Sequence, residues 1–389
     1  MSEAKKIRVV HMLATYNEKD NIGPMIEYLE KMAKGLPRYE FVILVADSKS
    51  PDGTGEVVKK MAKTRKNLHF IETPRGLGIS LIKAYQYSVK QLKADIVIPN
   101  DADFQWDPKL IPQLLKKLEE GYDVAVPSRH IKGGRSNFNA FRKLTHFVSN
   151  DLVNYYWGGI REVKDLAGNF KAIRVKGVLD KVELEKLNVK GFVIQSTMIY
   201  ELSKTGAKFC EIPAIYGERR SGEAKVGFNL QFVKDVFETV LNATKIRMER
   251  SQEFVKVCVV GFIGAVVQYS IFNFLRLSLE PAVANTVAVG AAIISNFTLN
   301  NVWTFKESKI AFFDFKKLLP KFMIFIMISF GSLLIQFLVM KVGVALLGRG
   351  FIIENGLVAV GILIGLIWNF TMYKKLIWKT KHSSSKKKK

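Results

Sequence analysis

The stretch Ile96-Val97-Ile98-Pro99-Asn100-Asp101-Ala102-Asp103 decides how the first half of this chain is expected to fold. A short apolar run bounded by polar residues is typical of a buried strand. This run ends on two carboxylates and is followed by Phe104-Gln105-Trp106-Asp107-Pro108, which leads into a helical stretch. Ligands of parallel sheets bind beyond the carboxyl ends of the strands, so Asp101 and Asp103 are expected to border a ligand site.

Short β-rich runs alternate with helical stretches throughout the segment before this motif. The expected strands are residues 7–13, 41–45 and 68–71, and the expected helices are residues 22–32, 56–64 and 77–92. Such alternation predicts a parallel, doubly wound α/β sheet. Tyr16, Glu18 and Asp47 also fall at strand ends, which predicts a single nucleotide site at that edge of the sheet.

The second half of the chain is mostly apolar. Four apolar spans lie at approximately residues 254–275, 282–302, 320–341 and 356–373. Each is close to the ~20 residues that cross a bilayer as a helix. Basic clusters follow the second and fourth spans, which predicts that both termini lie in the cytosol. No signal peptide is recognised at the N-terminus, so the first domain is expected to stay in the cytosol as well.

The formal net charge of +24 would ordinarily suggest nucleic acid as a partner. Many of the lysines flank apolar spans, however, as Lys316-Lys317 and Lys374-Lys375 do. This placement indicates loops beside an anionic lipid surface, so no nucleic-acid partner is expected. The two cysteines, Cys210 and Cys258, can form neither a disulfide framework nor a cysteine metal site.

The membrane half repeats itself. Phe254, Phe262, Gln268 and Tyr269 recur as Phe322, Phe330, Gln336 and Phe337, and Asn296-Phe297-Thr298 recurs as Asn369-Phe370-Thr371. These matches predict a duplicated helical hairpin whose asparagines, Asn296 and Asn369, face the interior of the bundle. Four segments are expected along the chain: an α/β domain (1–225), interfacial amphipathic helices (226–252), a four-span domain (253–380) and a basic disordered tail (381–389).

Residues near the carboxylate motif could hold a metal ion. Hard cations such as Mg²⁺ and Mn²⁺ prefer oxygen ligands and keep substrate phosphates as further ligands. Asp103 and the amide oxygen of Gln105 could therefore share one ion. An isolated Asp-x-Asp is a weak signal, and its weight comes from the strand before it and the helix after it. The five histidines show no metal-ligand spacing.

Several motifs together give the chain a resemblance to a known family. They are Tyr16-Asn17-Glu18, Ser50-Pro51-Asp52-Gly53-Thr54, Asp101-Ala102-Asp103-Phe104-Gln105, Ser128-Arg129, Asp165-Leu166-Ala167-Gly168 and Arg219-Arg220-Ser221-Gly222-Glu223-Ala224-Lys225. In these motifs the chain resembles the inverting family 2 glycosyltransferases that charge polyprenyl phosphates, the dolichyl-phosphate mannose synthases among them. The four-span region resembles the GtrA-like domain. The resemblance implies a GT-A (Rossmann-like) domain followed by an all-α, four-helix transmembrane domain.

The resemblance also implies roles for individual residues. The nucleotide-sugar would be bound by Ala14, Tyr16, Glu18, Val45, Asp47, Asp101, Ala102, Asp103, Gln105, Arg129, Arg219 and Lys225. The metal would be held by Asp103 and Gln105, and the lipid phosphate by Arg129, Arg142, His146 and Arg219. Asp101, Asp103, Arg129 and Arg219 would be the catalytic residues. Arginine suits these sites because its planar fork matches phosphate oxygens.

The implied reaction moves a single hexose, with mannose from GDP-mannose as the first expectation, to dolichyl or another polyprenyl phosphate at the cytosolic membrane face. The implied cofactor is Mg²⁺ or Mn²⁺. One alternative is a UDP-glucose-dependent enzyme, since Ser48 and Thr197 stand where relatives usually carry acids. Another is a lipid-sugar translocator with a weak or inactive transferase domain. A processive polysaccharide synthase is disfavoured because the chain has no Gln-x-x-Arg-Trp motif. A homo-oligomer is left open.

Overall fold

The computed structural model describes residues 6–187, 189, 191–221 and 230–378. The chain divides into two compact units, Met1–Ile246 and Arg247–Lys389. Lys225, expected to bind phosphate, lies outside the described residues, as do the proposed tail (381–389) and the first residues of the expected interfacial segment.

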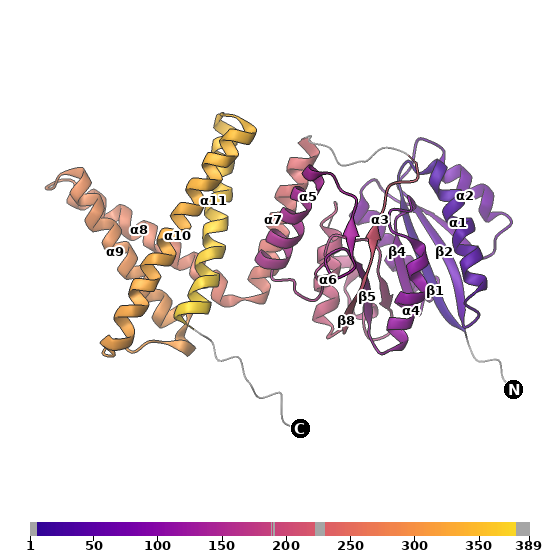
Figure 1. Ribbon diagram of the computed structural model, residues 1–389, viewed down its shortest axis with the longest axis horizontal. Coiled ribbons are helices and arrows are strands. Elements are labelled where there is room, and N and C mark those ends of the chain that lie inside the picture. The colour runs from indigo at the N-terminus through magenta and orange to yellow at the C-terminus, as the bar shows by residue number, and fades with distance from the viewer. Residues whose placement is uncertain (1–5, 188, 190, 222–229, 379–389) are drawn as a thin grey trace, which may run out of the picture. The chain divides into compact units, whose positions relative to one another are not determined.

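The first unit is built on a seven-stranded sheet with the order β3-β2-β1-β4-β7-β5-β8 (Figure 1). The strands are β1 (Ile7–Thr15), β2 (Tyr39–Asp47), β3 (Leu68–Glu72), β4 (Ile96–Asn100), β5 (Val124–Ser128), β7 (Ala172–Arg174) and β8 (Phe209–Pro213). The first four coincide with the strands expected from the sequence. A small separate sheet pairs β6 (Arg135–Ser136) with β9 (Ile215–Tyr216).

One strand departs from the all-parallel sheet that the sequence predicts. β7 runs antiparallel to both of its neighbours, β4 and β5. The loop before β7 already lies at the carboxyl edge of the sheet, where Asp165 contacts Arg129 and Asn169 contacts Asp101. A strand that starts from that edge must run in the opposite direction, so the expectation of a wholly parallel sheet is wrong at this position.

Helices cover both faces of the sheet, as a doubly wound fold requires. One face is covered by α1 (Lys19–Lys34), α2 (Thr54–Ala62) and α4 (Ile111–Glu119), and the other by α3 (Leu77–Lys90) and α6 (Ile194–Lys204). Side chains alternate along β1, so that Val9 and Leu13 join one core and Val10 and Met12 join the other. This burial fixes the register of the strands and thereby the position of their carboxyl ends.

Three helical segments carry an unusual number of exposed apolar side chains. They are α5 (Ala140–His146), the π-helical turn η2 (Phe147–Trp157) that continues it, and α7 (Leu230–Arg250). The exposed residues are Phe141, Leu144, Phe147, Val148, Leu152 and Tyr156 on α5 and η2, and Val236, Phe237 and Leu241 on α7. α7 is tied to η2 where the Trp157 Nε1 donates to the Thr244 hydroxyl at 2.7 Å.

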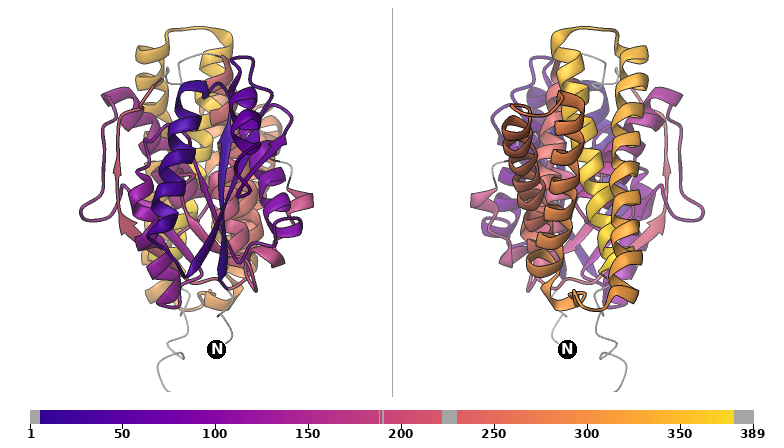
Figure 2. Two further views of the ribbon diagram at one scale, coloured as in Figure 1. Left: turned by 90° about the vertical axis from the view of Figure 1, so that its right-hand side faces the viewer. Right: turned by 90° about the vertical axis from the view of Figure 1, so that its left-hand side faces the viewer.

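The second unit contains four helices that are long and apolar enough to cross a membrane, at residues 252–275, 281–304, 315–346 and 356–377 (Figure 2). The helices are α8 (Gln252–Leu275), α9 (Pro281–Leu299), α10 (Phe315–Leu347) and α11 (Phe351–Met372). They agree with the four expected spans, and the protein is an integral membrane protein. α8 packs on α9 and α10 packs on α11, which gives the two hairpins that the internal repeat predicts. The side-chain oxygens of Asn296 and Asn369 are buried, as expected.

Gly134 provides a test of how tightly the end of β5 is packed. A Cβ at this position would lie 2.3 Å from the Ser128 carbonyl oxygen and 2.9 Å from the Arg129 carbonyl carbon. Both are backbone atoms that cannot move aside cheaply. We expect Gly134→Ala to lower the free energy of unfolding by about 1–3 kcal/mol, measured on the full chain in detergent by thermal unfolding.

Gly23→Ala is the matched control, because the nearest atom to its added Cβ is the Met61 sulfur at 3.9 Å. Gly23 lies inside α1, where alanine has the higher helix propensity, so its melting temperature should stay unchanged or rise. Equal melting temperatures for Gly134→Ala and the unsubstituted protein would contradict the close backbone approach.

Candidate active site

Two cavities open at the carboxyl edge of the sheet, both within the first unit. The acidic cavity, of about 320 Å³, is bordered by Glu18, Asp101 and Asp103. The apolar cavity, of about 490 Å³, is bordered by α5, η2, α7 and the start of α6. Five residues line both cavities: Leu77, Asp101, Arg142, Phe192 and Tyr216. A group bound at this shared wall could therefore contact molecules in either cavity.

The acidic cavity brings several carboxylates against one arginine. Asp103 is buried, and its Oδ1 accepts a hydrogen bond from the backbone nitrogen of Gln105 at 3.1 Å. Its Oδ2 lies 3.5 Å from Nη2 of Arg219. The same guanidinium forms a short ion pair with Glu18. Arg219 therefore offsets part of the negative charge that the strand ends concentrate there.

Asp101 shows how crowded with negative charge this edge is. Burial, and next the charge of Asp103, raise the pKa of Asp101 to about 7, whereas the hydrogen bond from Asn169 opposes the shift. A buried carboxylate that titrates near neutrality beside a second one favours binding of a cation, because a cation stabilises both charged forms. Oxygen ligands with excess negative charge suit Mg²⁺ or Mn²⁺.

Gln105 is oriented to present its amide oxygen. Its Oε1 accepts a hydrogen bond from the Tyr216 hydroxyl at 2.9 Å, and its Nε2 donates to the Gly217 carbonyl at 3.3 Å. An amide oxygen has two lone pairs, so one is left after the tyrosine bond. Asp103 and Gln105, both at the acidic cavity, thus fit the metal-ligand role that the sequence suggested for them.

Most residues expected around the nucleotide line the acidic cavity, but Val45 and Asp47 do not, and Arg129 borders the apolar cavity instead. Ala14, Tyr16, Glu18, Ala102 and Gln105 all line the acidic cavity. Val45 and Asp47 lie behind its wall among the described residues. Val45 is fully buried in the core. The Asp47 carboxylate accepts hydrogen bonds from the hydroxyls of Thr15 at 2.9 Å and Ser50 at 2.6 Å.

Arg75 was not identified from the sequence but borders the same cavity. Its guanidinium lies over the Tyr16 ring, with Cζ 4.7 Å from the ring centroid. The two side chains come from loops after different strands, β1 and β3, so no local sequence spacing indicates the contact. Together they form one flat, cationic wall of the acidic cavity.

Arg129 is held by a buried ion pair. Its Nε and Nη2 each donate to one oxygen of Asp165 at 2.7 Å, and both side chains are almost fully buried. Trp106 and Tyr216 flank the guanidinium, with centroids 5.0 and 5.1 Å from Cζ. Burial alone would raise the pKa of Asp165, but the charge and hydrogen bonds of Arg129 lower it below its usual range. Arg129 therefore reaches the apolar cavity in a fixed orientation.

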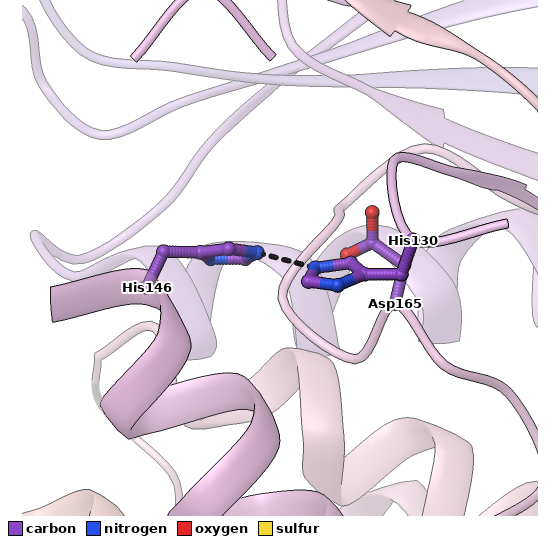
Figure 3. A group of neighbouring side chains, drawn as sticks. All are labelled: His130, His146 and Asp165. Atoms are coloured by element: carbon purple, nitrogen blue, oxygen red, sulfur yellow. Dashed lines mark hydrogen bonds between the residues drawn. The ribbon is translucent and has the colours of Figure 1, made fainter. Parts of the chain in front are cut away.

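The apolar cavity is also lined by Arg142 and His146, both on α5. His146 Nε2 lies 2.8 Å from Nε2 of His130, so the two rings share a hydrogen bond (Figure 3). Burial, and next the charge of Arg129, lower the pKa of His146 to about 3. His146 is accordingly neutral at physiological pH, and the two arginines supply the positive charge of this cavity.

His130, His146 and Asp165 also place one potential metal-ligand atom each within 4.8 Å of the others (Figure 3). No spacing in the sequence indicates this group, since the three residues come from different loops and helices. Both oxygens of Asp165 are already engaged by Arg129, whose positive charge would repel a cation.

Comparison with known proteins gives matches for both units. Residues 12–177 match the family Glycosyl transferase family 2, and residues 256–378 match the GtrA/DPMS transmembrane domain. A dolichol-phosphate mannosyltransferase of Pyrococcus furiosus is 27% identical over 381 residues, covering 96% of this chain and 100% of the relative. An undecaprenyl-phosphate mannosyltransferase of Micrococcus luteus is 26% identical over 242 residues, covering 61% of this chain and 93% of the relative. The crystal structure of mannosyl-3-phosphoglycerate synthase from Rubrobacter xylanophilus aligns with a TM-score of 0.45 at 18% identity, covering 63% of this chain and 74% of the other.

The Arg129–Asp165 pair predicts a large effect on stability. In Asp165→Asn the guanidinium stays buried without its counter-charge, and we expect a loss of about 3–5 kcal/mol in the free energy of unfolding. Because Arg129 lowers the pKa of Asp165, this stabilisation is complete above the ordinary aspartate pKa and is lost as the pH falls through the lowered value. Denaturation of the full chain at several pH values measures both effects.

Asp123→Asn serves as the control. Asp123 faces Arg174 at 3.6 Å in a partly exposed pair. Its loss should cost about 1 kcal/mol or less, because solvent screens such pairs. Similar losses in the free energy of unfolding for Asp165→Asn and Asp123→Asn would show that burial does not make the Arg129–Asp165 pair more stabilising than an exposed pair.

Proposed function

A family 2 glycosyltransferase domain followed by a GtrA/DPMS transmembrane domain makes this chain a membrane-bound glycosyltransferase, and we propose that it transfers one mannose from GDP-mannose to a polyprenyl phosphate such as dolichyl phosphate. The names of its relatives support this choice of donor sugar and acceptor. The observation that carries the proposal is the shared wall of two unlike cavities, one acidic and one apolar with arginines, which meet at Asp101, Arg142 and Tyr216.

The donor would occupy the acidic cavity. Its base would lie near Tyr16, and Asp101 and Ala102 would contact the nucleotide-sugar. Asp103 and Gln105 would hold Mg²⁺ or Mn²⁺, which when bound offsets charge on the departing nucleoside diphosphate. Arg219, now paired with Glu18 and Asp103, would exchange these carboxylates for phosphate oxygens when the donor enters. Lys225 would join it in phosphate binding.

The acceptor phosphate would occupy the apolar cavity, with the first isoprene units against its apolar lining. Arg129 and Arg142 would orient the phosphate, with His146 as a neutral hydrogen-bonding partner and Arg219 on the donor side. The acceptor is already an anion, so it needs no strong general base. Holding it in line with the anomeric carbon and reducing repulsion between two anions are the main contributions of these arginines. Attack opposite the leaving group would invert the anomeric configuration.

The location follows from the same proposal. The exposed apolar side chains on α5, η2 and α7 support an interfacial role for these helices, beside a cavity that would admit a lipid. We place the catalytic domain and both termini on the cytosolic side, because basic clusters follow the second and fourth spans. The partners would be the nucleotide-sugar, the polyprenyl phosphate and the bilayer, without nucleic acid.

Product analysis tests the reaction directly. The full chain in detergent is incubated with Mn²⁺, a polyprenyl phosphate and labelled GDP-mannose, or UDP-glucose in a parallel reaction, and the lipid is extracted. We expect a chloroform-soluble lipid-phosphate mannose that is lost when the metal is removed with EDTA. A product formed from UDP-glucose and not from GDP-mannose would identify UDP-glucose as the donor. A long glycan, or transport of preformed lipid-sugar without turnover, would contradict the proposed function.

Asp103→Asn tests the metal-binding residues. Removing the carboxylate should lower kcat/KM by about 100-fold or more, because the charge on the leaving diphosphate is then poorly offset. Asp107→Asn is the control from the same loop. The Asp107 side chain caps a short helix by accepting from the Lys109 backbone at 2.9 Å and lies outside both cavities among the described residues. Activity of Asp103→Asn near that of this control would rule out the metal assignment.

A further inference from the structure

Lys171 is an unusual residue in the sheet domain, because it is a fully buried lysine that borders neither cavity among the described residues. It lies directly before β7. Its ammonium group donates to the carbonyl oxygens of Gly168 and Asn169, each at 3.0 Å, and to Oε1 of Gln195 at 2.9 Å. Three acceptors match the three N–H donors of an ammonium group. A buried charge is costly, so this arrangement needs a reason beyond filling space.

The third bond begins a chain of side-chain contacts that ends at the active site. Gln195 Nε2 donates to Oδ1 of Asn169 at 3.2 Å. Asn169 Nδ2 donates to Oδ1 of Asp101 at 3.2 Å. Gln195 and Asn169 are both buried. The chain thus connects Lys171, through two amides, to the carboxylate at the wall shared by the two cavities.

The cation at one end determines how both amides are oriented. An amide can present either its oxygen or its nitrogen to a neighbour, and the partners decide between them. Burial lowers the pKa of Lys171 to about 7, whereas the charges of Asp101 and Asp165 oppose this shift. In its charged form the ammonium group can only donate, so Gln195 then turns its oxygen toward Lys171 and its nitrogen toward Asn169. Asn169 must then accept on that side and donate on the other. The Asp101 carboxylate accordingly faces the Nδ2 donor of Asn169.

We propose that Lys171 is a positioning residue for Asp101, acting through Gln195 and Asn169. The hydrogen-bonded chain fixes the Asp101 carboxylate at the boundary between the nucleotide-sugar and the acceptor. The inference rests on the proposed function, in which Asp101 contacts the sugar during transfer. Bonds that run head to tail in a water-poor interior strengthen one another, which favours a unit whose members depend on each other.

A purely structural role for Lys171 is the competing explanation, and Gln195→Glu separates the two. A glutamate would form a direct ion pair with Lys171 and should preserve the fold. Its carboxylate has no N–H group to donate to Asn169, however, so the series of hydrogen bonds to Asp101 would be interrupted. Lys171→Met removes the cation at similar length. Arg174→Met is the matched control. Arg174 lies on the adjoining strand and donates to the Leu118 carbonyl at 2.7 Å, so it takes no part in the series of hydrogen bonds from Lys171 to Asp101.

A double-mutant cycle tests the proposal on the full chain in detergent. Donor affinity is measured by calorimetry with Mn²⁺ and GDP-mannose, which needs no turnover, and kcat/KM is measured by lipid extraction. We expect Lys171→Met and Gln195→Glu to lower kcat/KM by about 10-fold and to weaken donor binding in the same direction. When Asp101→Asn is already present, either substitution should lower kcat/KM and donor affinity by less than about a further 2-fold, because residues of one network are not independent. Arg174→Met should stay within about 2-fold of the unsubstituted protein.

Two outcomes would overturn the inference: equal losses with and without the Asp101 carboxylate, or a Gln195→Glu variant as active and as tight-binding as the unsubstituted protein. If Lys171→Met does not fold, the Gln195→Glu cycle decides alone. If the unsubstituted protein binds GDP-mannose but forms no lipid product, the proposed function fails. The affinity cycle then still decides whether Lys171 positions Asp101.

Discussion

The structure depends on holding several buried carboxylates close together at one edge of a sheet, although their like charges repel one another. Glu18, Asp101 and Asp103 stand around one cavity, and like charges in a poorly hydrated site repel. Two cationic side chains limit the cost. Arg219 lies directly against two of the acids, whereas Lys171 acts on the third through amide groups. In the proposed function the acids of this cavity would hold a divalent cation, and the arginines beside them would face the diphosphate that accompanies it.

The neighbouring cavity differs, because in the proposed function it would hold an anion inside an apolar surface. Arg129 is kept there by the two oxygens of Asp165 and by aromatic rings on its sides. Such an arrangement fixes the direction of the guanidinium before any ligand arrives, so less entropy is lost on binding. His146 adds a polar group without adding charge at physiological pH, since burial, and next the charge of Arg129, hold its pKa low.

The first unit is suited to water and the second to lipid, and their backbone N–H and C=O groups are hydrogen-bonded in different ways. In the first unit the sheet and its covering helices bury two apolar cores. In the second, the spans are helices, so their backbone hydrogen bonds are made within each helix, as lipid requires. One polar side chain there, Asn301, accepts a hydrogen bond from Trp378 Nε1 at 3.0 Å.

Periodicity along the sequence was enough to identify β1 to β4, the helices between them and the four spans, because these depend on local alternation and length. The carboxylate motif could be placed at a strand end for the same reason. The direction of β7, the Arg129–Asp165 pair, the His130–His146 contact and the Lys171 network depended on the tertiary structure. Each of these features depends on residues that loops bring together from distant parts of the sequence, and no local sequence pattern shows which loops will meet. The sequence thus determined which elements form and which chemistry they can carry, whereas folding decided which charges become partners, since burial makes only close pairs energetically significant.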